Sequence, residues 1–475
     1  MREASAQRIP AAPPSGGHTR RARAVARAIC ARLQAAGHIA YLAGGCVRDR
    51  LLGRTPHDFD VATSARPEQV QALFRRTVAV GARFGVVVVL SRAGPIEVAT
   101  FRSDDAYVDG RRPSTVRFVG PEEDALRRDF TINALFEDPL SGEVLDFVGG
   151  RADLAARTIR AIGDPAARMR EDHLRLVRAV RLAAELGFTI EPATLAAVRA
   201  HAELVRQVAP ERLLPELTRL IVAPGRVAGL QLMKQTGLLR VLLPEVDALA
   251  GVEQPPEYHP EGDCWNHQLL VMQHLPEEPP AELAWAALLH DIGKPPTFRR
   301  AERIRFDGHA ALGAAMAEQV LARLRAPGKL RAVVAELVRE HLRFMEVRNM
   351  RASTLKRFLR RPTAELHLEL HRADCLASHG KLDNYWFCRE RLRAYRAEGE
   401  AQALRPPRLL TGHDLIRAGY RPGPAFAQML RAVEDAQLEG EVQSPEQALA
   451  LVRARFGPPP AGPAQLPAGD CAPHR

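Results

Sequence analysis

The sequence has few cysteines, few lysines and no long apolar segment. Its six cysteines form no CxxC pair and show no regular spacing, which argues against a disulfide scaffold and indicates a reducing compartment. No apolar run approaches the roughly 20 residues that a membrane helix needs, and the start of the chain lacks the apolar core of a secretion signal. These absences predict a cytoplasmic protein without a membrane anchor.

The positive charge comes almost entirely from arginine. Lys and Arg total 67, of which five are lysines, against 56 Asp and Glu, so the formal net charge is +11. Clustered basic side chains release counterions from phosphates and steer association, so RNA, DNA or nucleotides fit as partners. A general preference for arginine in the source proteome would give the same charge, and the charge alone therefore identifies no partner.

A chain of 475 residues is too long for one hydrophobic core, and we expect three or four packed units. Apolar residues make up 46% and charged residues 26%, which is ordinary for a globular protein. Between about residues 18 and 160, short β-branched runs alternate with helical patterns, as in an α/β or α+β domain. From about residue 161 apolar residues recur at three-and-four spacing, which predicts a mostly helical remainder.

A glycine turn and two aspartates stand close together in the segment YLAGGCVRDRLLGRTPHDFDVAT. It reads as strand, turn, helix and second strand. Gly44 and Gly45 allow backbone N–H groups to approach a triphosphate, and Arg48 lies in the first turn of a helix whose N-terminus favours anions. Asp58 and Asp60 are two apart on the second strand, so both carboxylates face one side and can hold Mg²⁺.

This pattern suits phosphoryl transfer at two metal ions, where one ion activates a 3′-hydroxyl and the other stabilises pyrophosphate. Glu97, in the strand IEVATF, is the candidate third acid, since a neighbouring strand can bring it beside the pair. An isolated DxD is more often an exposed strand edge. The glycine turn, Arg48 and the motifs downstream favour the functional interpretation.

The segments GGCVRDRLLG…HDFDVAT, RRDFTINALF and REDHLRLVRAVRLAAELGF resemble the successive motifs of class II tRNA nucleotidyltransferases and bacterial poly(A) polymerases. The resemblance spans about residues 40 to 220. It implies an α+β fold class, with an N-terminal nucleotidyltransferase palm built on a small mixed sheet and an all-α neck, body and tail. The expected divisions are a disordered start at 1–17, a palm at 18–160, a neck at 161–225, a body at 226–400, a tail at 401–456 and a disordered end at 457–475.

The resemblance also implies roles for single residues. Asp58 and Asp60 correspond to the Mg²⁺ ligands, and Gly45 and Arg48 to nucleotide-binding positions. Within RRDFTIN, Arg128 corresponds to a residue on the nucleotide, and the ribose-recognising neighbourhood takes in Asp129 and Asn133. Any single Arg or Asp here could instead belong to an ion-pair cluster at a helix N-terminus, but the whole string is typical of the family.

Asp172 and Arg175 are three apart on a predicted helix, so we expect them on one face. An Arg fork can donate to the ring-nitrogen side of cytosine while a carboxylate accepts from its exocyclic amine, and adenine offers a comparable edge. Guanine and uracil lack that amine, so a mismatched base would leave buried polar groups unpaired. An ordinary surface salt bridge is the alternative. The pair therefore predicts acceptance of CTP and ATP.

Arg178 and Arg181 continue the three-residue spacing and correspond to nucleotide-binding positions of the family. Three residues along an ideal helix fall roughly 60° short of a full turn, so the side-chain direction rotates by that amount at each step. Arg181 is therefore expected roughly opposite Asp172, where it can share that face only by bending or by a long reach.

Smaller features bear on which reaction the family resemblance implies. The segment GARFG at residues 81–85 resembles the CCA-adding form, and residues 102–118 resemble the loop associated there with switching from CTP to ATP. The chain ends in a neutral Pro/Gly/Ala tail rather than a long basic extension of the poly(A) polymerase kind. We expect CCA addition to tRNA, with a poly(A) polymerase or a partial C-adding or A-adding enzyme as alternatives.

The stretches WNHQLLVMQHL, AALLHDIGKP, GHAALGAAM, REHLRF and HRADCL resemble an HD-type phosphohydrolase domain. This implies a metal set of His267, His290, Asp291 and Asp374. Imidazole and carboxylate ligands suit Mn, Ni, Fe, Co or Mg ions, which lower the pKa of bound water. Larger versions add ligands at the positions of His309 and His341, and Lys294 could contact phosphate. A vestigial helical scaffold is the alternative.

Two further expectations concern the helical half. The segment TGHDLIRAGYRPGPAFAQMLRAV puts glycines before an amphipathic helix, so residues 401–456 are expected to bind RNA without base specificity, although a plain helix–turn–helix fits as well. A competing hypothesis makes the HD phosphohydrolase primary and the first domain a nucleotide sensor or RNA-binding module. The expected partners are tRNA, CTP and ATP.

Overall fold

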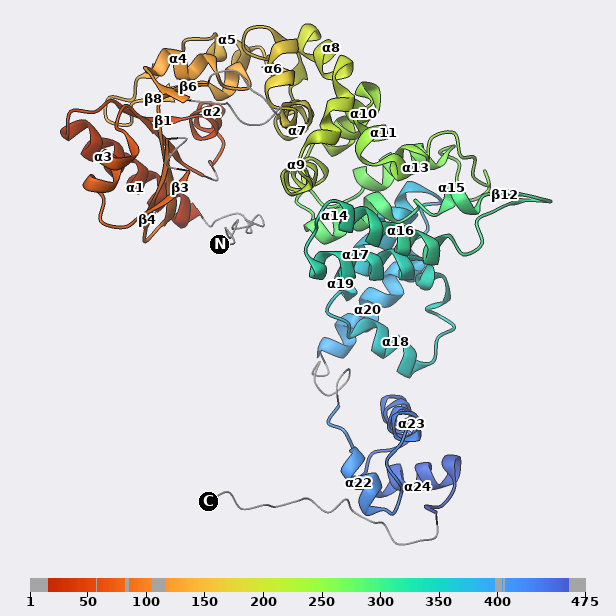
Figure 1. Cartoon of the computed structure of the whole chain (residues 1–475). Helices are drawn as coiled ribbons and strands as arrows, with labels where there is room; N and C mark the ends of the chain where they lie inside the picture. Colours follow the sequence, from red (N-terminus) through yellow and green to blue (C-terminus); the bar gives the residue numbers. More distant parts are fainter. Residues whose placement is uncertain are drawn as a thin grey trace, which may run out of the picture.

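The computed structural model describes residues 16–56, 58–81, 85–104, 116–397, 404 and 406–460. Most of the two segments expected to be disordered lies outside these ranges, and the first and last described helices begin at Gly16 and end at Phe456. Figure 1 shows four parts in chain order, which we name head (α1–α5), neck (α6–α12), body (α13–α20) and tail (α22–α24). None of the described helices is long and apolar enough to cross a membrane.

The head is built on a seven-stranded mixed sheet with the order β3-β4-β5-β2-β1-β8-β9. The pair β2 and β5 is parallel, whereas the other neighbours are antiparallel. Val61 and Val98 are buried in the core of the head, as expected of β-branched strand residues. The strands of the sheet are β1 (Ala40–Ala43), β2 (Asp60–Thr63), β3 (Thr77–Gly81), β4 (Val86–Ser91), β5 (Gly94–Thr100), β8 (Phe136–Glu137) and β9 (Val144–Leu145).

Helices and short strands surround this sheet. A separate hairpin pairs β6 with β7, and β10 pairs in parallel with β11 of the neck. These elements are α1 (Gly16–Ala35), α2 (Gly45–Leu51), α3 (Pro67–Leu73), β6 (Arg102–Asp104), β7 (Val116–Phe118), α4 (Pro121–Leu126), η2 (Thr131–Asn133), α5 (Gly150–Ala155), β10 (Thr158–Ile159) and β11 (Thr189–Ile190).

The neck is helical and its second helix, α7, buries most of its residues. Helix α7 packs against α9 and α10, so it lies between the head and the rest of the chain (Figure 1). The neck comprises α6 (Pro165–Glu171), α7 (Leu174–Leu186), α8 (Pro192–Ala200), η3 (Ala202–Gln207), α9 (Pro210–Val222), α10 (Arg226–Thr236), α11 (Leu238–Leu242) and α12 (Pro244–Asp247).

One buried arginine ties the neck to the body. The Arg226 guanidinium donates to the carbonyl oxygens of Met272, Leu275 and Pro276, which follow one another at the end of α13 and beyond it. Carbonyl groups at a helix C-terminus have no partner within the helix. The bonds from Arg226 therefore satisfy them and join α10 to α13.

The body is a helical assembly with one protruding β-hairpin. Its helices share a continuous apolar core with the neck and head, while α18 and α20 surround a second, smaller core. The body comprises α13 (Cys264–Gln273), α14 (Ala281–Leu289), α15 (Lys294–Thr297), β12 (Arg299–Arg300), β13 (Ile304–Arg305), α16 (His309–Arg323), α17 (Gly328–Glu340), η4 (His341–Glu346), α18 (Ala352–Leu359), α19 (Ala364–Ala377) and α20 (Asp383–Ala397).

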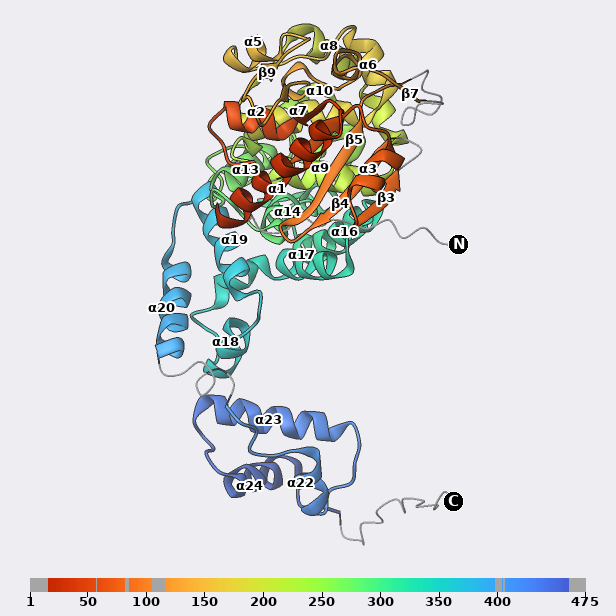
Figure 2. The same ribbon diagram turned by 90° about the vertical axis from the view of Figure 1, so that its left-hand side faces the viewer.

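The tail has its own small core and extends away from the body (Figure 2). It consists of α22 (Gly412–Arg417), α23 (Ala425–Glu439) and α24 (Pro445–Phe456). A mixed sheet domain followed by helical parts confirms the expected α+β class. The five cysteines in the described part of the chain are buried and free.

Candidate functional site

Three carboxylates gather at one edge of the β2–β5 pair. Asp60 lies directly opposite Glu97 in the parallel register, so both side chains leave the sheet on the same face. Asp58 precedes β2 rather than lying within it, which corrects the expectation of two aspartates on one strand. The alternation still holds, because Phe59 is buried while Asp58 and Asp60 are exposed. All three carboxylates line a cavity of about 630 Å³.

The glycine turn lies beside these carboxylates. Gly44 has φ +75°, a backbone conformation that side chains disfavour, and a Cβ there would lie 3.2 Å from Nη1 of Arg128. Gly45 begins α2. Arg48 is buried, and its Nη1 donates to Oδ1 of Asn133 at 2.6 Å. The turn therefore lets the backbone of Gly44 and Gly45 and the side chain of Arg48 border the same cavity.

Arg128, Asp129 and Asn133 of the RRDFTIN segment also border this cavity. Arg128 donates from Nε and Nη2 to Oδ2 of Asp124, at 3.1 and 3.0 Å. Asp129 accepts from Nδ2 of Asn133 and pairs with Arg178 at 2.7 Å. Burial raises the pKa of Asp129, but Arg178 and other partners outweigh it and hold that pKa below its usual range. Asp129 therefore stays charged and fixes Arg178.

The expectation that Asp172 and Arg175 share a helical face is wrong. Helix α6 ends at Glu171 and α7 begins at Leu174, and Asp172 has the extended backbone angles φ −139° and ψ 105° between them. Its carboxylate accepts from the Leu174 N–H at 3.1 Å and from Nη2 of Arg212 at 2.7 Å. An aspartate can bond the backbone of a following helix start, and this competes with continuing the previous helix.

Arg175 uses its guanidinium elsewhere. Nη1 donates to Glu171 at 2.6 Å and to the Arg168 carbonyl at 3.0 Å, and Nη2 donates to the Arg127 carbonyl at 3.2 Å. Asp172 and Arg175 nevertheless both line the cavity. The fold therefore places both residues at the same cavity, although they do not belong to one continuous helix.

Arg178 and Arg181 both lie in α7 and both border the cavity. The pKa of Arg178 is raised, chiefly by Asp129. Arg181 pairs with Glu216 at 2.6 Å and with Glu185 at 2.5 Å, and its side chain is 4% exposed. The helical-wheel comparison with Asp172 fails because Asp172 is not part of α7. In this state the Arg181 guanidinium is held by two carboxylates.

Several cavity residues were not singled out from the sequence. Asp49 and Arg127 lie within the quoted motifs GGCVRDRLLG and RRDFTINALF, so the motifs themselves indicated them. Arg212 comes from α9, forty positions after its partner Asp172, and nothing in the local sequence marks it. With the predicted ones, the cavity is bordered by nine arginines and six carboxylates: Arg48, Arg102, Arg127, Arg128, Arg175, Arg178, Arg181, Arg212, Arg219, Asp49, Asp58, Asp60, Glu97, Asp129 and Asp172.

Two sequence features lie partly or wholly outside the described residues. Residues 82–84 of the GARFG segment are among them, and so are residues 105–115 of the expected switching loop. These two features favoured CCA addition over poly(A) synthesis, and that preference stays a prediction.

The body holds a second cluster of charged and imidazole groups. His267 Nε2 lies 3.1 Å from Oδ1 of Asp374 and 3.7 Å from Oδ2 of Asp291. His290 Nε2 lies 3.3 Å from the same Asp291 oxygen. All four predicted metal-binding residues are therefore brought together, and His267, His290 and Asp374 form one potential ligand group.

A second potential ligand group shares Asp291. His309 Nε2 and His341 Nε2 lie 3.6 and 3.9 Å from its other oxygen, Oδ1, and the three residues can hold one ion. Lys294 Nζ lies 2.7 Å from Oδ2 of Asp291 and 2.7 Å from Oε1 of Gln254. One carboxylate thus lies between two sets of histidines, as a bridging ligand would.

Hydrogen bonds at Nδ1 fix the orientation of the histidine rings in the cluster. Each Nδ1 faces an acceptor: Oε1 of Glu261 for His267 at 2.7 Å, and the carbonyls of Ala287, Phe306 and Val338 for His290, His309 and His341 at 2.9, 2.8 and 2.6 Å. An acceptor at Nδ1 holds a proton on that nitrogen and directs Nε2 toward the position of a metal.

The buried polar atoms of the cluster fit a metal site. His267 Nε2 and Asp291 Oδ2 are buried and face charged neighbours, Asp374 and Lys294, while His290 Nε2 is buried without a hydrogen bond of good geometry, which is costly for a polar atom that binds nothing. Burial lowers the pKa of His267, but hydrogen bonds to Asp374 and Glu261 outweigh it and raise this pKa to about 9. The donor set of imidazoles and carboxylates suits divalent ions.

Three parts of the chain match known domain families. Residues 40–160 match the poly A polymerase head domain, residues 187–249 match a probable RNA- and SrmB-binding site of polymerase A, and residues 264–378 match the HD domain. The matches confirm the family resemblance read from the motifs and indicate that the head and body use divalent metal ions.

Curated relatives and solved structures agree with these domains. The chain is 48% identical over 217 residues to the CCA-adding enzyme of Levilactobacillus brevis, covering 45% of this chain and 54% of the relative. It is 42% identical over 260 residues to that of Latilactobacillus sakei, covering 54% and 64%. The chain thus spans between half and two thirds of these relatives.

The structure is similar to the Bacillus stearothermophilus CCA-adding enzyme in complex with CTP, with a TM-score of 0.69 and 28% identity over 91% of this chain and 97% of that one. It shares its fold with the Thermotoga maritima CCA-adding enzyme complexed with tRNA, with a TM-score of 0.56 and 18% identity over 91% and 95%.

Removing the acceptor behind His267 tests the cluster as a metal site. We expect Glu261→Gln to weaken Mn²⁺ binding about 10- to 100-fold, since loss of such outer partners misorients the ligand. Competition with a chelator measures the affinity. Glu253→Gln, an exposed acid nearby (62% side-chain exposure), is the control and should bind as the unaltered protein does. Equal affinities for all three proteins would contradict this reading of the cluster.

Proposed function

We propose that this chain is a CCA-adding member of the class II tRNA nucleotidyltransferases, transferring CMP, CMP and AMP from CTP and ATP to the 3′ end of tRNA with release of pyrophosphate. The observation that carries the proposal is the register of β2 and β5. It sets Asp60 opposite Glu97, with Asp58 on the same side, in a cavity bordered by nine arginines.

Asp58, Asp60 and Glu97 are the residues that would hold Mg²⁺. Their carboxylate oxygens are the hard ligands this ion prefers, and bound Mg²⁺ would supply activation of the 3′-hydroxyl and charge neutralisation of the leaving pyrophosphate. Gly44 and Gly45 leave room for the triphosphate beside the backbone.

Arg48 and Arg128 bind phosphate oxygens in this proposal, from positions already fixed by Asn133 and Asp124. Asp129 and Asn133 bond to each other at 3.2 Å and lie near the ribose of the nucleotide. Arg178, held by Asp129, adds positive charge next to them. The nucleotide therefore meets side chains that need little reordering.

Asp172 and Arg175 select the base. Asp172 accepts from the exocyclic amine of cytosine or adenine, and Arg175 donates to the neighbouring ring atoms. Arg212 positions Asp172 through its 2.7 Å ion pair, a contribution that the sequence did not suggest. Arg181 acts through its ion pair with Glu216, which joins α7 to α9, while its pair with Glu185 lies within α7. We place this reaction in the cytoplasm.

A second candidate activity is hydrolysis of phosphate esters by the body. It is supported by the four Nε2 atoms directed at Asp291, which would hold Mn, Fe, Ni, Co or Mg ions together with Asp374. Such ions would supply an activated water, and Lys294 would stabilise the phosphate. Cyclic phosphates and 2′-phosphates at RNA ends are the proposed substrates.

The ordered addition of nucleotides tests the main proposal. Transcripts of tRNA that end before CCA, after C or after CC receive CTP, ATP or both, and product lengths are read at single-nucleotide resolution. We expect addition of C, C and A in this order, followed by a stop. Long adenosine tracts from ATP alone would indicate a poly(A) polymerase. Addition of only C or only A would indicate a partial enzyme. If no nucleotide were incorporated, the hydrolase with a sensor domain would become the favoured hypothesis.

The base-selection proposal makes a separate prediction. In Asp172→Ala, we expect the preference for CTP over UTP, measured as the ratio of kcat/KM values, to fall about 10- to 100-fold, because one buried hydrogen bond is lost with the correct base. Glu211→Gln, an exposed acid next to Arg212, is the matched control. An unchanged preference in Asp172→Ala, or an equal fall in Glu211→Gln, would rule out this role.

A further inference from the structure

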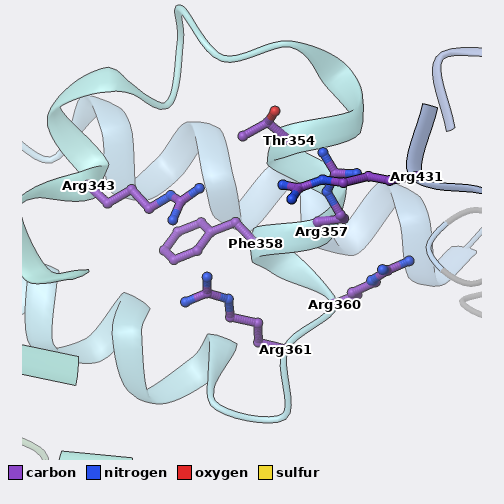
Figure 3. Close-up of a pocket in the computed structure, with 7 residues that line it drawn as sticks. All are labelled: Arg343, Thr354, Arg357, Phe358, Arg360, Arg361 and Arg431. Carbon is purple, nitrogen blue, oxygen red and sulfur yellow. The ribbon is translucent and has the colours of Figure 1, made fainter. Parts of the chain in front are cut away.

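A second cavity, of about 390 Å³, lies between the body and the tail (Figure 3). Five of its lining residues are arginines, and the other two are Thr354 and Phe358. The arginines come from η4, from α18 and the residues directly after it, and from α23: Arg343, Arg357, Arg360, Arg361 and Arg431.

The contact between body and tail at this cavity is polar. Ser353 on α18 donates to Glu439 at 2.7 Å, and Lys356 donates to the Leu438 carbonyl at 2.8 Å. The apolar cores on the two sides are separate. Polar and charged contacts therefore contribute to holding α23 on α18.

Four of the five arginines have carboxylate partners. Across the joint, Arg357 pairs with Asp435, and Arg360 pairs with Glu434 at 2.7 Å. Within the body, Arg343 and Arg361 pair with acids of α17.

Arg431 on α23 differs from the other four. No carboxylate of the described residues pairs with it, and its side chain reaches toward Arg357 in Figure 3. Among the described residues, the cavity therefore has five guanidinium groups and four carboxylates that pair with them. Like charges that line one cavity repel each other, and an anion between them relieves the repulsion.

The lining also limits what the anion is. Phe358 is 2% exposed, and the guanidinium groups of Arg343 and Arg361 lie 5.3 Å from the centre of its ring. The ring is thus unavailable for stacking on a nucleobase, which is how aromatic side chains hold single-stranded RNA. Thr354 supplies the one hydroxyl. Guanidinium forks without a base-reading group fit phosphate oxygens.

We propose that this cavity binds a phosphate group, which lies between Arg431 of the tail and Arg357 of the body and thereby holds α23 on α18. The source is a backbone phosphate of the RNA substrate or a free phosphate anion. The RNA source rests on the proposed function, whereas the free anion does not.

Binding of tRNA tests the site through its salt dependence. We expect Arg431→Gln in the full chain to bind tRNA about fivefold more weakly at moderate salt, and the slope of log affinity against log salt to decrease by about 1, the value for one lost phosphate contact. Arg92→Gln, in the exposed turn between β4 and β5 of the head, removes the same charge outside the tail and the cavity and should leave both quantities unchanged. Equal effects of the two substitutions, or none, would overturn the proposal.

Hydrogen exchange of α23 identifies the source of the phosphate. Slower exchange with inorganic pyrophosphate in the unaltered protein, absent in Arg431→Gln, would assign a free anion. Slower exchange with tRNA alone, again absent in the variant, would assign the RNA backbone. No slowing with either probe would overturn the proposal. Failure of the unaltered protein to bind tRNA at all would count against the proposed function, while the pyrophosphate arm would still test the cavity.

Discussion

The parallel pairing of β2 with β5 is the constraint on which the head depends. It puts Asp60 beside Glu97, and the alternation of side chains puts Asp58 on the same face while Phe59 turns into the core. A shift of one residue would turn each of these carboxylates to the opposite face. Burial of Val61 and Val98 on the other face holds the register. The packing of the sheet therefore fixes the chemistry of its edge.

Around this edge, the arginines are ordered by carboxylates of the protein itself. Asp124 holds Arg128 and Asp129 holds Arg178, so both guanidinium groups have fixed positions at the cavity. Ordering such side chains on binding would lower affinity and rate. The histidine and carboxylate cluster of the body is arranged in a similar way, because an acceptor at each Nδ1 directs the Nε2 of that histidine toward Asp291. In both places, hydrogen-bond acceptors beside the arginines and histidines fix the orientation of these side chains.

The parts of this arrangement that depend on neighbouring residues could be predicted from the sequence. The glycine turn, the aspartates two apart and the His290-Asp291 pair carry their spacing in the chain. The change of apolar period near residue 160 predicted a sheet domain followed by a helical remainder, and the family resemblance implied the α+β class. The break at Asp172 was missed because the apolar spacing runs on through it, while the extended backbone there depends on bonds to Leu174 and Arg212.

Contacts across long sequence separations could not be predicted. Arg212 reaches Asp172 from another helix, and the arginine cavity unites α18 with α23 across about seventy residues. Such pairs depend on how α7, α9 and the tail pack. No local pattern of residue types encodes that packing.

Nucleotide incorporation by two variants tests the central claim, that the carboxylates of the head and not the metal cluster of the body carry out the transfer. The measurement is the rate of labelled CMP and AMP incorporation into tRNA lacking CCA by Asp60→Asn and by Asp291→Asn. The account predicts a loss of about a hundredfold or more in Asp60→Asn, and retention of most of the rate in Asp291→Asn. Persistent incorporation by Asp60→Asn, or its loss in Asp291→Asn alone, would contradict it.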